Sequence, residues 1–301
     1  MSGIATRFNQ IIKNIFHNQC TDNAIDVVPS VVRAHNVELE LIEGTHITSS
    51  LHPSIIHFSL NKAATQYVKS ILVQCAAESG MNHADINGYA FDTDFPFLDH
   101  LSAEEMERYQ HVFKKKGYLY STFGGMVEGI PELEKYRIVF FIRDPRDILV
   151  SSYYSQAFSH VVPDKTGSKH DGFMKRREWA RASTIDEYAL TESIKVNSIL
   201  EKYCNLLLKP YRNTYVTTYE DMIADFSRWL DALLKYCELT ISDGLRSKII
   251  SDNSHLRPMT EDVQKHLRKG VAGDYKEKLQ PATIQQLNRT FAAALELFGY
   301  R

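Results

Sequence analysis

The stretch SIIHFSLNKAATQYVKS, residues 54–70, combines an apolar run, a short polar turn and an amphipathic segment. The run 54–60 is typical of a buried strand, and the spacing of apolar residues after the turn predicts a helix over 65–79. Backbone N–H groups at a helix N-terminus attract anions, and Lys62 adds a full positive charge. The turn lacks the glycines of a Walker loop. From this segment alone, an anion site and an ordinary strand–helix turn are equally expected.

A second strand and helix are predicted in RIVFFIRDPRDILVSSYYS, residues 137–155. The apolar run 137–142 is typical of a strand covered on both faces of a sheet. Asp144 is expected to cap the following helix, with Pro145 at its first position and Asp147 completing a pattern like a capping box.

The same segment places a cation and a hydroxyl on one side. Ser151 lies seven positions after the expected cap, close to two helical turns, so it returns to the face of the cap. Arg143 and Ser151 are therefore expected to meet on one phosphate. In the alternative interpretation, Arg143 pairs with Asp144 or Asp147, and Ser151 is a small packing residue.

A third basic stretch is HLRKGVAGDYKEKL, residues 266–279. Arg268 and Lys269 precede Gly270, and Gly273 follows three positions later. Glycine permits a positive φ and close approach of backbone N–H groups to a ligand. Such a basic pair can close over a phosphate, although for this fragment in isolation a basic surface turn is the favoured interpretation.

The remaining pattern alternates helices with strands, including a helix over 184–208, a strand over 214–219 and mainly helices after 221. This alternation predicts a single α/β domain, residues 1–301, with a central, mainly parallel sheet flanked by helices. In open parallel sheets, ligands bind beyond the carboxyl ends of the strands.

Three further regions have their own expected roles. A helical stripe over residues 1–20 is expected to pack on the chain's own core, within an N-terminal extension 1–45. Residues 80–118 are expected to form loops and short helices around an acceptor site, and residues 158–182, with little periodicity, a lid. Carboxylates in the first of these loops would suit a cationic acceptor or simply be solvated: Asp85, Asp92, Asp94 and Asp99.

Composition excludes several classes of protein. The formal net charge is −2, with 35 basic and 37 acidic residues, which argues against a nucleic-acid partner. No apolar run reaches the roughly 20 residues that span a bilayer. The four cysteines show no metal-ligand spacing, which indicates reduced thiols and a cytoplasmic protein.

Taken together, the three stretches resemble the sulfotransferases that use 3′-phosphoadenosine 5′-phosphosulfate (PAPS). The family pattern P-K-[SA]-G-T-T-W corresponds to residues 61–67, and its arginine and serine, eight residues apart, correspond to Arg143 and Ser151. Its R-K-G-x-x-G-D-W-K signature corresponds to RKGVAGDYK, 268–276, and a Y-E-D-M segment begins at Tyr219. The last two matches resemble the cytosolic, small-molecule branch. The implied fold is a P-loop-like α/β domain.

The resemblance implies roles for individual residues. Lys62 would stabilise the leaving group, while Thr65 and Gln66 would hold the 5′-phosphate and Tyr67 would stack on adenine. The residues implied in binding PAPS or its product 3′-phosphoadenosine 5′-phosphate (PAP) are Lys62, Ala63, Ala64, Thr65, Gln66, Tyr67, Arg143, Ser151, Tyr219, Arg268, Lys269 and Gly270. Four cations among them match the roughly four negative charges of PAPS, so no metal is expected.

The sequence departs from the family pattern at two places. Ala64 stands where the family has glycine, which is feasible if its φ stays negative. The stretch 118–126 lacks the histidine that serves the family as a base, and among His111, His100, Asp94 and Glu128 we name His111 and Glu128 as catalytic candidates. Otherwise the acceptor is itself nucleophilic, or the protein binds nucleotide without turnover.

The expected activity is in-line transfer of a sulfuryl group from PAPS to a hydroxyl or amine of a small-molecule acceptor. The alternatives are a metal-dependent P-loop phosphotransferase and a catalytically idle nucleotide-binding protein. The chain is expected to be a monomer or a homodimer.

Overall fold

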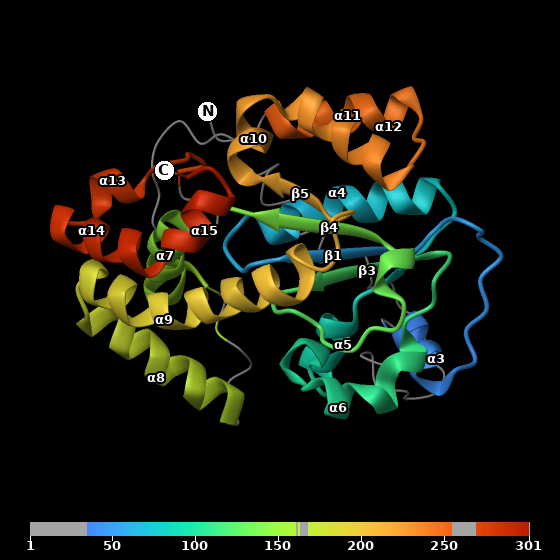
Figure 1. Ribbon diagram of the computed structural model, residues 1–301, viewed down its shortest axis with the longest axis horizontal. Coiled ribbons are helices and arrows are strands. Elements are labelled where there is room, and N and C mark those ends of the chain that lie inside the picture. The colour runs from blue at the N-terminus through green and yellow to red at the C-terminus, as the bar shows by residue number, and fades with distance from the viewer. Residues whose placement is uncertain (1–34, 161, 163–167, 255–268, 301) are drawn as a thin grey trace, which may run out of the picture. The chain divides into compact units, whose positions relative to one another are not determined.

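A five-stranded sheet lies at the centre of the computed structural model, which describes residues 35–160, 162, 168–254 and 269–300 (Figure 1). The strand order is β2-β3-β1-β4-β5, and all four pairings are parallel. The strands are β1 (Ile55–Ser59), β2 (Asn82–Ala84), β3 (Tyr118–Phe123), β4 (Arg137–Ile142) and β5 (Tyr215–Thr218). The predicted α/β class with a parallel sheet is confirmed.

Three strands coincide with predicted ones, and two were missed. The predicted strands 54–60, 137–142 and 214–219 are β1, β4 and β5. The short β2 and the polar-centred β3 give no clear apolar run. β3 pairs with β1 on one side and with β2 on the other, so it belongs to the middle of the sheet.

Helices cover both faces of the sheet (Figure 1). One face carries α4 (Thr65–Glu78), α10 (Tyr219–Ala224), α11 (Phe226–Cys237) and α12 (Asp243–Ser254). On this side the Phe141 ring of β4 packs on Trp229 of α11, with ring centroids 6.1 Å apart. The other face carries α7 (Pro145–Tyr154), α9 (Ile185–Tyr203), α14 (Pro281–Thr290) and α15 (Ala292–Leu297).

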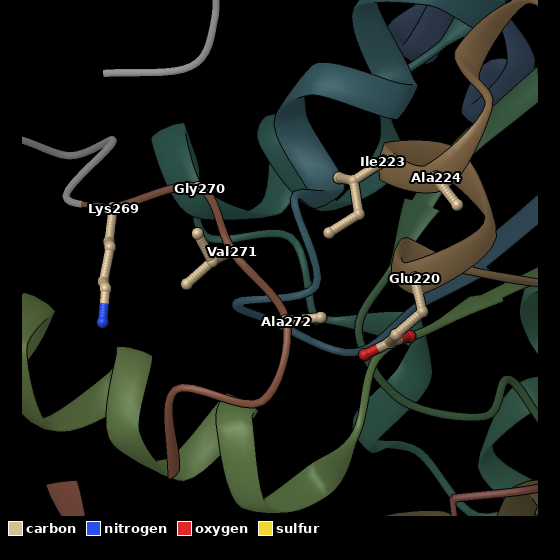
Figure 2. A pocket seen from close by; sticks show the side chains of 7 residues that line it. All are labelled: Glu220, Ile223, Ala224, Lys269, Gly270, Val271 and Ala272. Carbon is tan, nitrogen blue, oxygen red and sulfur yellow. The ribbon is translucent and has the colours of Figure 1, made fainter. Parts of the chain in front are cut away.

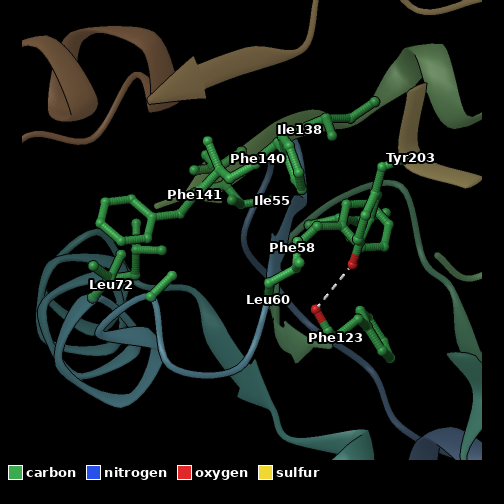
Figure 3. Packing of buried hydrophobic residues seen from close by; sticks show 14 of the residues in the cluster. Ile55, Phe58, Leu60, Leu72, Phe123, Ile138, Phe140, Phe141 and Tyr203 are labelled. Carbon is green, nitrogen blue, oxygen red and sulfur yellow. Dashed lines mark hydrogen bonds between the residues drawn. The ribbon is translucent and has the colours of Figure 1, made fainter. Parts of the chain in front are cut away.

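Aromatic packing fills the second face. Phe58 of β1 and Phe140 of β4 are register partners, and both contact Tyr203, at centroid distances of 5.7 and 4.6 Å. The Tyr203 hydroxyl donates to the Phe123 carbonyl, 3.4 Å away at the end of β3 (Figure 3). All five residues of β1 are buried. The sheet is thus held from both sides, and β1, β3, β4 and β5 end at the same edge.

The predicted loop regions contain more helix than expected. Residues 80–118 hold short helices as predicted: α5 (Ile86–Asp92), η1 (Leu98–His100), α6 (Ala103–Met106) and η2 (Glu107–Val112). Within 158–182, where a lid loop was expected, a helix, α8 (Ser168–Ala182), occupies much of the segment. Among its described residues, Phe173, Arg177 and Ala180 are buried, and the charged residues between them hide the periodicity.

The other elements complete the described chain. They are α3 (Asn36–Glu43), η3 (Leu133–Lys135), the π-helical turns η4 (Ser155–Ser159) and η5 (Cys204–Leu208), and α13 (Tyr275–Lys278). The expected helix over residues 1–20 lies outside the described residues. No helix in the described ranges is long and apolar enough to cross a membrane.

Candidate functional site

The turn between β1 and α4 has an unusual backbone. Lys62 and Ala64 adopt positive φ angles of 74° and 63°, so the expectation that φ stays negative at Ala64 was wrong. Ala64 is the residue that caps α4, and the left-handed conformation lets the chain turn directly from the strand into the helix. For a residue with a Cβ this conformation costs roughly 1–2 kcal/mol. The tight turn is therefore retained without glycine.

The turn is fastened from inside by Thr65. Its hydroxyl donates to the Leu60 carbonyl at 2.8 Å and lies 3.0 Å from the Ser59 hydroxyl, while the Ala63 N–H donates to the same carbonyl at 3.2 Å. Thr65 is buried, whereas Gln66 is exposed. The Tyr67 N–H already donates to the Ala64 carbonyl at 3.0 Å. The groups left for a ligand are the backbone N–H groups of residues 64–66, since the first N–H groups of a helix have no partner within it.

The Lys62 side chain reaches a second segment of the chain. Its ammonium donates to the Ser155 hydroxyl at 2.8 Å, just after α7. Burial, with the charge of Arg143 as the smaller cause, lowers the pKa of Lys62 to about 8. The ammonium is thus close to a second cation and paired with a hydroxyl, an environment that favours an anion.

Arg143 follows β4 directly, at the carboxyl edge of the sheet. The residue is 9% exposed, and Nη2 donates to the Val271 carbonyl at 2.9 Å and to Asp147 at 3.2 Å. The guanidinium lies over the Tyr219 ring, 4.4 Å from its centroid. Its Nε is buried and has no partner among the described residues. The site therefore contains a positioned guanidinium with an unused donor.

The start of α7 differs from the expected capping box. Asp144 caps the helix by accepting from the Arg146 N–H at 2.9 Å, and Pro145 is its first residue, as predicted. Asp147, however, accepts from the N–H groups of Gly273 at 2.7 Å and Tyr275 at 2.9 Å instead. The predicted capping box was therefore wrong, because the Asp147 carboxylate binds the third basic stretch. This contact joins the segment 137–155 to the segment 266–279.

Three other predicted residues have their own surroundings. Ser151 is a partly exposed residue of α7, and Tyr219 is the buried first residue of α10. Tyr67 is partly buried; its hydroxyl donates to Asn253 at 2.9 Å, and its ring lies 6.1 Å from that of Phe226.

A cavity of about 470 Å³ opens beside Arg143 and Tyr219. Figure 2 shows its walls, with Ile223 and Val271 reaching in from different segments. The lining residues are Glu220, Ile223, Ala224, Lys269, Gly270, Val271 and Ala272. Since Val271 also accepts the bond from Arg143, the cavity and the guanidinium belong to one site.

The third basic stretch contributes less free charge than expected. Lys269 donates to Asp274 at 2.8 Å and to Glu277 at 2.6 Å, and these bonds raise its pKa. Gly270 has a positive φ of 68°, the backbone conformation that was expected to require a glycine at this position. Arg268 lies outside the described residues.

The two candidate bases, His111 and Glu128, form hydrogen bonds with residues outside the Lys62 turn. The His111 ring contacts the Ile42 carbonyl at 2.8 Å and is exposed, and Glu128 accepts from Lys202 at 2.9 Å. No described contact joins either of them to the Lys62 turn. The sequence analysis missed Ser155, whose position four residues after Ser151 in SSYYS is the only signal for it.

One family of known proteins matches most of the sequence. The family model of the sulfotransferase domain matches residues 52–299. Because this match covers most of the chain, the chain belongs to the sulfotransferase family. It is a PAPS-dependent sulfotransferase, and the predicted family is confirmed.

Solved structures with similar chains were also found. Mouse sulfotransferase SULT7A1 complexed with PAP shares 16% identity and a TM-score of 0.46, over 86% of this chain and 88% of that one. Retinol dehydratase in a complex with retinol and PAP shares 14% identity and a TM-score of 0.42, over 85% and 84%. None of the curated proteins matches this chain.

Proposed function

We propose that this chain transfers a sulfuryl group from PAPS to a hydroxyl or amine of a small-molecule acceptor at the site between the Lys62 turn, Arg143 and the cavity. The observation that supports this most is the paired placement of the two cations. Lys62 and Arg143 follow adjacent strands, β1 and β4, and their charges interact. Such a pair, with helix N–H groups beside it, suits a ligand with more than one phosphate.

The donor fits the residues present. The unpartnered Nε of Arg143 is a buried donor that a phosphate oxygen would satisfy, which removes the cost of an unpaired polar group. Arg143 and Ser151 would hold the 3′-phosphate, the N–H groups of residues 64–66 would hold the 5′-phosphate, and Tyr219 would lie by the adenine. Bound PAPS would supply an activated sulfuryl group on a good leaving group.

Lys62 has the central role in the chemistry. Its ammonium is preorganised in a half-buried site, where electrostatic stabilisation of developing negative charge is stronger than in water. The proton that the acceptor loses must reach another group, and His111 and Glu128 are the candidates from the sequence. In the described part of the chain, no group of three or more His, Cys, Asp or Glu side chains is arranged to hold a metal ion.

The proposal is tested by titrating the protein with PAP in a calorimeter and by thermal unfolding. A ligand of the native state at a hundred times its Kd adds about 2.7 kcal/mol of stability. Lys62→Ala and Arg143→Ala should each weaken PAP binding by about tenfold or more. Lys235→Ala, which removes an exposed lysine of α11, is the matched control.

Transfer of labelled sulfate from PAPS is then measured with and without EDTA. Transfer that persists in EDTA rejects the metal-dependent phosphotransferase. Absence of any heat or stabilisation on adding PAP would overturn the proposed function itself.

A further inference from the structure

Asp99 carries an unusual carboxylate at the carboxyl edge of the sheet. One oxygen, Oδ2, accepts three N–H bonds: from Gly124 at 3.0 Å, from Gly125 at 2.9 Å and from the Asn87 amide at 3.0 Å. The other oxygen, Oδ1, is buried and has no partner among the described residues. Three donors fix the carboxylate in place and leave one oxygen free to accept a hydrogen.

The neighbouring Asn87 has the same property. Its amide nitrogen donates to Asp99, which fixes its orientation, and its own oxygen is also buried without a partner. Leaving such an acceptor unpaired costs roughly 1–3 kcal/mol. The two residues are joined by one hydrogen bond, and each keeps one unpaired acceptor oxygen, so together they form a small site that suits a group with polar hydrogens.

This site lies beside the Lys62 turn. A Cβ built on Gly124 would lie 3.6 Å from the Asn61 amide nitrogen and 3.8 Å from Asp99 Oδ2. Asn61 immediately precedes Lys62. Gly124 follows β3, the neighbour of β1, at the edge where the turn begins. The charge of Asp99, together with burial as the larger cause, raises the pKa of Tyr203, whose hydroxyl marks the end of β3.

We propose that Asp99 is the group that receives the proton of the acceptor, with Asn87 as a positioning residue beside it. This inference rests on the proposed function. The acceptor's O–H or N–H donates to Asp99 Oδ1, and a new bond forms between that oxygen or nitrogen and sulfur. The bond between sulfur and the oxygen of PAPS breaks, its electron pair leaves with PAP, and the proton passes to Asp99.

Asp99 also explains how the chain can do without a histidine in 118–126. That stretch contains Gly124 and Gly125, and their N–H groups hold the carboxylate. A Cβ at Gly125 would lie 3.0 Å from the Asp99 carbonyl oxygen and 3.4 Å from the Asp99 Cβ, so glycine at this position leaves room for the side chain that comes from η1. General-base assistance contributes roughly 10²- to 10⁴-fold to a rate. Loss of the Asp99 carboxylate should therefore lower the transfer rate by a measurable factor.

A resident water molecule is the competing explanation. A water donating to both unpaired oxygens would satisfy them without any part in the reaction. It predicts that loss of the carboxylate alters stability and leaves transfer unchanged.

The experiment compares wild type with Asp99→Asn, whose side chain keeps an oxygen for the Gly124 and Gly125 N–H groups. The acceptors are hexanol, hexylamine, and 4-nitrophenol at a pH where it is ionised. Hydrolysis of PAPS, in which water is the acceptor, is measured as well. This gives a transfer rate for every variant even if it accepts none of the three organic acceptors. Glu104→Gln removes an exposed carboxylate of the same segment as the control. PAP is titrated into each preparation.

Asp99→Asn should lower transfer to water, hexanol or hexylamine by a hundredfold or more, and to ionised 4-nitrophenol by less than tenfold. PAP affinity should stay within twofold, as in Glu104→Gln. Should Asp99→Asn fold poorly, Asp99→Gly with added formate tests the same point, since a free carboxylate should restore part of the rate. Equal losses for all acceptors, no loss, or no rescue would overturn the inference. Failure of wild type to bind PAP would instead overturn the proposed function.

Discussion

The ammonium of Lys62 donates a hydrogen bond to the hydroxyl of Ser155 across 93 residues of sequence, at 2.8 Å. The bond joins the turn after β1 to the end of α7. A hydroxyl leaves the positive charge uncompensated, whereas a carboxylate would neutralise it. The contact therefore positions the lysine while its charge stays available for an anion.

The first prediction concerns the pH dependence of PAP binding. The pKa of Lys62 lies near 8, below that of a solvated lysine, because of burial and Arg143. An anion favours the protonated form, so binding takes up a proton once the free protein has lost it, and affinity falls as pH rises through about 8. Calorimetric titration should show log Kd rising towards about one unit per pH unit at higher pH.

A variant with a permanent charge is the control for this prediction. Lys62→Arg should give a much flatter profile above pH 8, because arginine stays protonated. The phosphate of PAP itself titrates near pH 6 and adds nothing in this range. An equally flat profile in wild type up to pH 10 would contradict the assignment.

The second prediction concerns the guanidinium of Arg143. Arg143→Lys keeps the charge but loses the stacking on Tyr219 and the planar fork that also holds the Val271 carbonyl. We expect PAP affinity to fall by about tenfold or more, measured by titration. Arg137→Lys, at the opposite end of the same strand, should bind PAP like wild type. If both substitutions have the same small effect, Arg143 is not a phosphate ligand.

The sequence predicts the class of fold and three strands because buried strands such as β4 are continuous apolar runs. It also predicts Asp144 as a cap and the position of Arg143 at a strand end. These features depend on residues close together in sequence. The match of the sulfotransferase family model covers residues 52–299, a longer part of the chain than these local patterns.

Other features of the site depend on contacts between segments that are distant in sequence, and local sequence patterns do not predict such contacts. The carboxylate of Asp147 fits a capping box, yet it binds Gly273 and Tyr275, more than 120 residues away. The same holds for the bond between Lys62 and Ser155. In the sequence, Asp99 is one of several acidic residues that could be solvated. Its distinguishing contacts are with Gly124 and Gly125, 25 and 26 residues further along the chain.

The third prediction concerns the backbone at Ala64. Its φ of 63° is unfavourable for alanine and accessible to glycine, so Ala64→Gly relieves strain. The greater freedom of glycine in the unfolded chain offsets part of the gain. We expect a net stabilisation of about 0.5–1 kcal/mol in denaturant unfolding.

An alanine within the same helix provides the comparison. Ala77 is an exposed residue of α4, and Ala77→Gly should destabilise the protein by about 1 kcal/mol. Opposite signs for the two substitutions would support the left-handed conformation at Ala64. Destabilisation by both would contradict it.

Two histidines in the strands of the sheet, one buried and one partly buried, contribute to the response to acid. His57 of β1 is fully buried and contacts the Thr122 hydroxyl at 3.0 Å, while His83 of β2 contacts the Ser121 hydroxyl at 2.9 Å. Burial, followed by the charge of Lys69, lowers the pKa of His57 to about 3 and that of His83 to about 4. Both are therefore neutral in the folded protein at pH values where the unfolded chain binds protons.

The fourth prediction follows from this difference. With folded pKa values below the unfolded value of about 6.5, the two histidines stabilise the fold above pH 6.5, and that contribution is lost as pH falls towards 4 and then 3. The free energy of unfolding, from urea titrations between pH 4.5 and 6, should fall by about 1.4 kcal/mol per pH unit for each histidine. His57→Gln should reduce the slope by about one proton, whatever it does to stability itself. A slope that does not respond to His57→Gln would show that this histidine is protonated in the fold, since only a group with different pKa values in the two states contributes.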